Sequence, residues 1–159
     1  YFTHDRPPLW ILPAWPIAAL AVDRLTIFVD RKIPADMRLG WAYWTMIPMF
    51  VIGMSAFSWH TRHVVSTCTV IGLMIGVALS TTNIRRDVVL FLAGSGLGIL
   101  LEYWGTSRFC WTYYTQEIPP PVAIVAHGFA SIAFNRALEV GQWARSLLPG
   151  RHAPSPRVH

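Results

Sequence analysis

The side chains most able to take part in chemistry lie in one segment, which runs from residue 102 to the triple proline at 119–121. Glu102 and Arg108 carry its first charges, and Tyr113 and Tyr114 carry phenol groups. If the chain is an enzyme, these four residues are the candidate catalytic group. The alternative is structural, because aromatic side chains collect at membrane surfaces and a Glu102–Arg108 ion pair at a helix end accounts for the charges.

The layout of this segment resembles that of membrane-embedded carotenoid hydratases of the bacterioruberin pathway. The shared features are a glutamate at a helix end, a glycine three residues later, and a run of tyrosine and threonine that leads to proline. In this chain they are Glu102, Gly105, Tyr113, Tyr114, Thr115 and Pro119. The resemblance implies that Glu102 is the acid that protonates a double bond of a carotenoid or another polyprenoid lipid.

His127 follows Ala123 by four residues and has small neighbours on both sides. The Ala-x-x-x-His pattern resembles the bacteriochlorophyll-ligating pattern of light-harvesting helices, which implies that His127 is an axial pigment ligand. The alternative is a neutral histidine that is hydrogen-bonded to a neighbouring helix, since a buried polar group requires a partner. The sequence contains no group of residues at metal-ligand spacing and no nucleotide-binding loop.

Five apolar stretches must position these residues. The chain has 159 residues, of which 53% are hydrophobic and 13% charged, with a mean hydropathy of +0.41. This is too apolar for a soluble domain, and each stretch is long enough to cross a hydrocarbon core of about 30 Å. The sequence predicts an all-α integral membrane bundle over residues 1–148 and a short basic tail over 149–159. The expected spans are about 9–29, 41–59, 64–82, 88–104 and 121–138.

The cations predict the orientation of this bundle, because cytoplasmic loops carry an excess of Lys and Arg. One side receives Arg31, Lys32, Arg38, Arg85, Arg86, Arg145, Arg151 and Arg157, and the other receives Arg6, Arg62 and Arg108. We therefore expect a protein of the bacterial inner membrane, with its N-terminus outside and its C-terminus in the cytoplasm. The cations are scattered between apolar runs, which argues against nucleic-acid binding despite the net charge of +5. Because the sequence begins at Tyr1 rather than methionine, we also expect residues upstream.

Two glycine pairs predict close helix packing. Gly72 and Gly76, and likewise Gly94 and Gly98, are four residues apart and therefore lie on one face of a helix. Such pairs let helix backbones approach closely within a membrane. We expect one packing seam on the third span and another on the fourth.

The two cysteines, Cys68 and Cys110, both fall toward the outside in this topology. Thiols on an oxidising side can pair, so we predict a Cys68–Cys110 disulfide. The alternative is two unrelated small buried side chains.

Two functions follow from these patterns. The first is an accessory subunit of a larger membrane complex, photosynthetic or respiratory, that packs beside partner helices and binds membrane lipid or a pigment such as a carotenoid or bacteriochlorophyll. The apolar helices, the glycine seams and eight tryptophans support it. The second is a membrane-embedded enzyme that acts on a carotenoid or another polyprenoid lipid.

Overall fold

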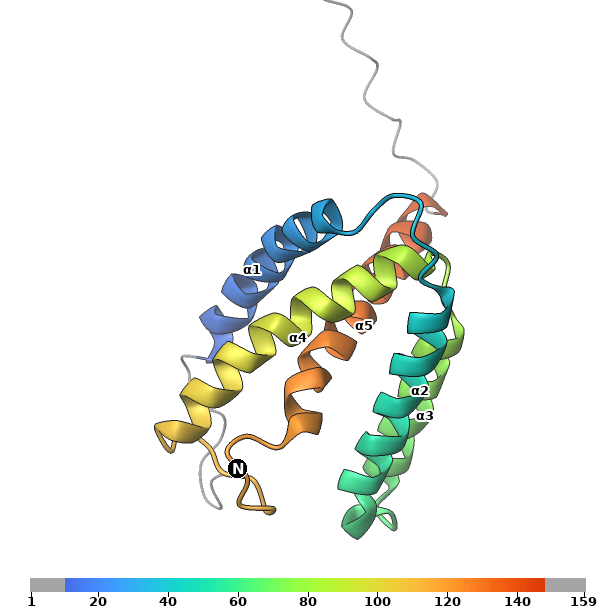
Figure 1. Cartoon of the computed structure of the whole chain (residues 1–159). Coiled ribbons are helices and arrows are strands. Elements are labelled where there is room, and N and C mark those ends of the chain that lie inside the picture. Colours follow the sequence, from blue (N-terminus) through green and yellow to red (C-terminus); the bar gives the residue numbers. More distant parts are fainter. Residues whose placement is uncertain (1–10, 148–159) are drawn as a thin grey trace, which may run out of the picture.

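The computed structural model describes residues 11–147, with side chains from residue 13. Within this range the chain forms five α-helices and one short 3-10 helix, and no strand (Figure 1). The elements are α1 (Ile11–Lys32), α2 (Gly40–Phe57), η1 (Trp59–Thr61), α3 (Val65–Leu79), α4 (Ile84–Ser107) and α5 (Pro121–Ser146). The predicted all-α class is confirmed. The predicted tail and the first residues of the span 9–29 lie outside the described residues.

The helix ends follow local signals rather than the limits of the apolar runs. α4 begins at Ile84, before the predicted 88, because the Asn83 side chain accepts a hydrogen bond from the Arg86 amide at 3.0 Å and caps the helix. α5 begins at Pro121, where a proline is tolerated because the first helical amide has no partner. It continues to Ser146, beyond the predicted 138, so polar turns extend both helices past their apolar parts.

α4 and α5 form the centre of the fold. They make the most extensive contact in the described chain, and α1 packs on α4 (Figure 1). α2 and α3 lie side by side as a hairpin, and this hairpin contacts α5 more than it contacts α4. Successive helices run in alternating directions, so the bundle has two ends.

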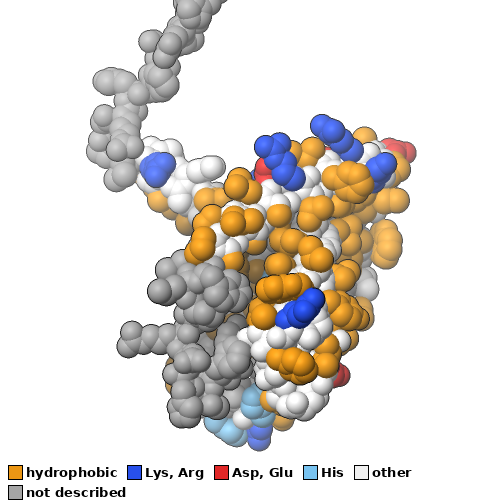
Figure 2. Space-filling view, turned by 90° about the vertical axis from the view of Figure 1, so that its left-hand side faces the viewer, with side chains coloured by type: hydrophobic (Ala, Val, Ile, Leu, Met, Phe, Trp, Pro, Cys, Tyr) orange, Lys and Arg blue, Asp and Glu red, His pale blue; other side chains and the backbone are white. Residues whose placement is uncertain are grey.

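One end of the bundle is basic. α1 finishes there with Arg31 and Lys32, α4 starts there with Arg85 and Arg86, and α5 finishes there with Arg145. Most Lys and Arg side chains visible in Figure 2 lie near this upper end, and hydrophobic side chains cover much of the described surface below it. We call this the basic end and the opposite one the Glu102 end.

Glycines bring the backbones of α4 and α5 together. A Cβ atom on Gly94 would lie 2.6 Å from the His127 carbonyl oxygen and 2.8 Å from the Gly128 Cα. A Cβ on Gly98 would lie 2.5 Å from the Ile124 carbonyl oxygen. Gly128 faces back toward the Phe91 carbonyl across the same interface. Contacts this short require glycine, so the Gly94–Gly98 face lies directly against α5.

The other glycine pair does not pack within the described chain. A Cβ on Gly72 or Gly76 would meet nothing within 4 Å. α3 turns Met74 and Ala78 inward instead, and both glycines lie about 200° around the helix from Met74. The expected seam on this helix is therefore not formed inside the described chain, and the glycines lie on its exposed face.

Two helices in the described chain, α4 and α5, are long and apolar enough to cross a membrane. α3 is apolar but has 15 residues, and α2 has no charged residue along its 18. By length and composition, then, two helices could span a membrane, and the remaining three predicted spans are not established by this criterion.

The close contact of α4 and α5 makes a specific prediction about alanine substitutions. Gly94→Ala should destabilise the protein by about 1–3 kcal/mol, because the added methyl has no space against α5. Gly96→Ala adds the same methyl to the same helix where nothing lies within 4 Å. It should be neutral or stabilising by up to about 1 kcal/mol, since alanine favours helix. Thermal unfolding of both variants, followed by circular dichroism, measures the difference; equal shifts would disprove the close contact.

Candidate functional site

A buried carboxylate organises the Glu102 end. Glu102, near the end of α4, is 5% exposed. Its Oε2 accepts hydrogen bonds from Trp111 Nε1 at 3.0 Å and from the Tyr113 hydroxyl at 2.9 Å. Its Oε1 lies 2.9 Å from Nε2 of His127, on α5. We call these four residues the Glu102 cluster.

Glycines on the same face of α4 make room for the cluster. Gly98 and Gly105 lie four residues before and three residues after Glu102, and so share its side of the helix. A Cβ on Gly105 would collide with the six-membered ring of the Trp111 indole. A Cβ on Gly98 would lie 3.0 Å from the Cβ of His127. Because Gly105 and Gly98 carry no side chains, the Trp111 indole and the His127 imidazole can reach the carboxylate.

The segment after α4 folds back over the helix end. The Cys110 amide donates to the Gly105 carbonyl at 2.9 Å, and Phe109 adopts a positive φ of 55° at this turn. A second turn closes where the Gln116 amide donates to the Tyr113 carbonyl at 3.0 Å. These turns carry Trp111 and Tyr113 to the carboxylate, and the segment then enters α5 through the prolines.

Chemically, the cluster is a buried acid joined to a partly exposed base. Oε2 accepts from two donors and Oε1 lies against the His127 imidazole, and a carboxylate away from water needs such partners. The His127 side chain is 30% exposed, against 7% for that of Glu102, so the imidazole is the accessible member of the pair. A carboxylate–imidazole pair can hold or pass a proton. In the described chain, no three His, Cys, Asp or Glu side chains gather as a metal site.

The structure brings together some of the predicted catalytic residues and separates others. Glu102 and Tyr113 are in direct contact, whereas Arg108 is an exposed residue at the end of α4. The expected Glu102–Arg108 ion pair is therefore wrong, since neutral donors and His127 occupy the carboxylate. Tyr114 points elsewhere: its hydroxyl donates to the Phe57 carbonyl, which ties the segment to the end of α2.

His127 follows the structural alternative more closely than the pigment interpretation. Its Nε2 contacts Glu102 of the neighbouring helix, as expected for a histidine that is hydrogen-bonded to a neighbouring helix. Ligation of a macrocycle by that nitrogen would require it to leave Glu102, and the pigment interpretation stays a prediction. The Ala123 pattern still contributes to structure, because Ala123 is buried.

The predicted disulfide is absent, since both cysteines are free. Cys68 lies in the first turns of α3, and its thiol contacts the Arg62 carbonyl at 3.2 Å. Cys110 lies beyond α4 in the turn next to Gly105. The Cys68 thiol therefore lies against the turn after η1, and Cys110 lies at the end of α4.

A second polar network lies toward the basic end. Asp87 of α4 is 1% exposed and pairs with Arg136 of α5 at 2.7 Å. Arg136 also pairs with Glu139 at 2.7 Å, and Asn135 bridges Glu139 to Arg86. A buried charge pair with this many hydrogen bonds is costly to break, so the network joins the two central helices in a defined register.

Comparisons with protein-family models, curated proteins and solved structures return no match for this chain. The resemblance to carotenoid hydratases therefore stays a prediction, and function must be argued from the geometry.

The sequence did not predict that Trp111 donates a hydrogen bond to Glu102. It placed this residue only in the general group of interfacial aromatics. The available signal was Gly105, a glycine one helical turn after a lone acid and before an indole. The missing side chain at Gly105 leaves the space that the Trp111 indole fills.

The two tyrosines provide a matched test of the cluster. Tyr113→Phe removes a hydroxyl that donates to a buried carboxylate and should lower the free energy of unfolding by about 1.5–3 kcal/mol. Tyr114 is an exposed residue, and Tyr114→Phe removes a hydroxyl that donates to an uncharged backbone carbonyl, so it should cost about 1 kcal/mol or less. Thermal or denaturant unfolding in detergent measures both. A larger loss for Tyr114→Phe would show that the Glu102 contacts do not hold this end together.

Proposed function

We propose that this chain is a small integral membrane subunit without catalytic activity, whose five helices cross the membrane and whose α3 docks against helices of a larger complex. The observation that carries the proposal is the exposed face of α3. This face comprises Val65, Thr69, Gly72, Gly76 and Leu79, and we call it the glycine face.

Support for membrane insertion comes from where the apolar side chains lie. Only 22% of the most apolar stretch of α5 is buried inside the protein, whereas the core helix of a soluble protein is mostly buried. α2 and α3 together expose Met49, Ile52, Val70 and Leu73, each at least half exposed. Apolar surface this extensive on several helices fits a lipid environment.

The hydroxyl groups on these helices also fit an apolar solvent. Thr45 is exposed on α2, and its hydroxyl donates to the Trp41 carbonyl one turn earlier at 2.7 Å. Thr69 on α3 does the same to the Val65 carbonyl at 2.9 Å. A hydroxyl bonded to its own helix has no need of water, so it costs little in lipid.

The distribution of cations supports the orientation. The cations at the basic end would lie in the cytoplasm and Arg62 and Arg108 outside, in agreement with the excess of Lys and Arg on the cytoplasmic side. The Glu102 cluster would then lie near the outer surface of a bacterial inner membrane. The Asp87–Arg136 network would lie between α4 and α5 toward the cytoplasmic side, where a buried pair avoids exposure of charge to lipid.

The glycine face is suited to a partner helix. Two glycines one turn apart form a flat strip, and Val65 and Leu79 flank it at 81% and 67% exposure. In lipid, helices associate by close packing at such strips rather than by the hydrophobic effect. A Cβ on either glycine would meet nothing within 4 Å, so a helix of another membrane protein can lie along the face without disturbing the fold.

An enzyme that acts on a carotenoid or another polyprenoid is the second candidate, and the Glu102–His127 pair favours it. The burial and hydrogen bonds of the same pair argue against catalysis. Glu102 is almost wholly buried, and its two oxygens already have three partners within the chain. A polyene substrate would have to displace at least one of them before it could accept a proton. We therefore assign the cluster a structural role, in which Glu102 joins α4, α5 and the segment between them.

The docking proposal predicts a selective loss of association. Gly76→Leu fills the strip on α3 and should abolish co-migration with partner proteins in mild detergent, because the partner helix can no longer approach. The folded chain itself should be unchanged, since nothing lies within 4 Å of that position. Gly96→Leu makes the same change at an exposed glycine of α4 and serves as the control. Co-migration that survives Gly76→Leu, or a wild-type chain that migrates alone, would overturn the proposal.

The topology predicts which cysteines are accessible from outside. With Cys68→Ser as background, Cys110 should react with a membrane-impermeant maleimide added to intact spheroplasts. Asp36→Cys, in a chain without Cys68 and Cys110, places a thiol in the exposed connection between α1 and α2 and should react only after the membrane is permeabilised. Labelling of the residue-36 thiol in intact spheroplasts would reverse the assigned orientation. A chain recovered in buffer without detergent would rule out membrane insertion.

A further inference from the structure

An apolar groove lies beside the turn that joins α2 to α3. It has a volume of about 460 Å³ and is lined by residues from the end of α2, from η1 and the turn after it, and from α3. They are Ser55, Ser58, Trp59, Arg62, Cys68, Ile71, Gly72 and Ile75. This volume falls within the range of about 300–1,000 Å³ that small-molecule sites occupy.

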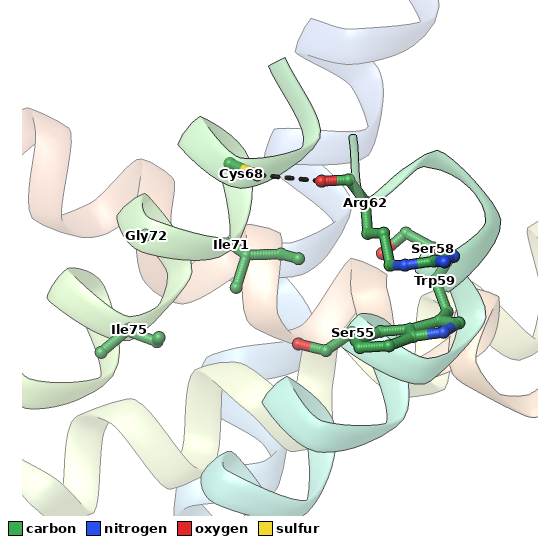
Figure 3. A pocket seen from close by; sticks show the side chains of 8 residues that line it. All are labelled: Ser55, Ser58, Trp59, Arg62, Cys68, Ile71, Gly72 and Ile75. Atoms are coloured by element: carbon green, nitrogen blue, oxygen red, sulfur yellow. Dashed lines mark hydrogen bonds between the residues drawn. The ribbon is translucent and has the colours of Figure 1, made fainter. Parts of the chain in front are cut away.

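The two sides of the groove differ in character. Figure 3 shows the Arg62 guanidinium beside the Trp59 indole at one side, and Ile71 and Ile75 of α3 at the other. The guanidinium lies 5.0 Å from the centre of the indole ring. The groove therefore runs from a cationic end to an aliphatic floor on the membrane-facing side of the hairpin.

Arg62 keeps hydrogen-bonding capacity for a ligand. Its NH1 donates to the Trp59 carbonyl at 3.1 Å, while its carbonyl accepts from the Cys68 thiol. Among the described residues that line the groove, Arg62 alone is an Asp, Glu, Lys or Arg, so no carboxylate there neutralises it. A guanidinium held above an indole with donors left over is a suitable partner for a phosphate group.

We propose that this groove binds one membrane phospholipid, with its phosphate on Arg62 and an acyl chain along Ile71 and Ile75. The site rests on the membrane insertion proposed above but not on the docking of a partner. A lipid has both required parts in the required order: an anionic group at the depth where arginine and tryptophan lie, and a hydrocarbon chain that extends toward the centre of the bilayer. An apolar partner helix would satisfy the aliphatic floor, but the cationic end also calls for an anion, which a phospholipid carries in its headgroup.

The groove and the glycine face are adjacent and separable. Gly76, which tests docking, does not line the groove, whereas Ile75 does. Around the α3 axis, Ile75 and Gly76 lie on opposite sides of Gly72. Gly72 belongs to both surfaces, but a bound lipid would cover the flank of α3 that carries Ile71 and Ile75 and leave Gly76 and Leu79 open. Each surface can therefore be tested without altering the other.

Native mass spectrometry of the purified chain, incorporated in nanodiscs that contain phosphatidylglycerol and then released into mild detergent, tests the proposal. The wild type should retain one phosphatidylglycerol. Arg62→Gln should lower the retained fraction by about tenfold, since one charge-assisted contact is lost. Arg108→Gln removes an exposed arginine from the same end of the bundle and is the matched control, which should retain the lipid.

A second variant tests the acyl-chain part of the site. Ile75→Trp should fill the groove and also reduce retention, while Gly76→Leu should leave it unchanged. Equal retention by wild type, Arg62→Gln and Ile75→Trp would overturn the lipid site and leave membrane insertion intact. A chain that stays soluble without detergent or nanodiscs would instead remove the membrane proposal on which the site depends.

Discussion

The close approach of α4 and α5 is the contact on which the rest of the structure depends. Gly94 and Gly98 on one helix and Gly128 on the other bring the backbones to distances that no side chain would allow. Because the helices are this close, Glu102 and His127 can meet at one end of the interface and Asp87 and Arg136 at the other. Both polar contacts therefore depend on the glycines of the α4–α5 interface.

The two polar contacts have similar roles in different surroundings. At the Glu102 end, a carboxylate collects donors from a helix and from an irregular segment, so it fixes a loop to the bundle. At the basic end, an ion pair joins two regular helices and sets their register. In the membrane setting proposed above, where unpaired polar groups are costly, such contacts would hold together helices that the hydrophobic effect does not.

The α2–α3 hairpin contrasts with this centre. Its buried side is anchored by Tyr43, which is fully buried and donates to the Ala78 carbonyl at 2.6 Å, and by the stacked rings of Phe50 and Phe129. Its other side is apolar and open. The hairpin therefore has a packed inner face and an apolar outer face, and the proposed contact with lipid or another membrane protein rests on the outer one.

The sequence alone determined the all-helical class, the approximate position of each helix and the gathering of cations at one end. These features depend on local apolar runs and local charge, which a linear pattern records. Only the tertiary structure decided that Trp111 and His127, rather than Arg108, reach Glu102, that one glycine pair is buried while the other is exposed, and that the cysteines stay apart. Such outcomes depend on how the helices pack against one another. Two Gly-x-x-x-Gly motifs of equal spacing do not show which of them will contact another helix.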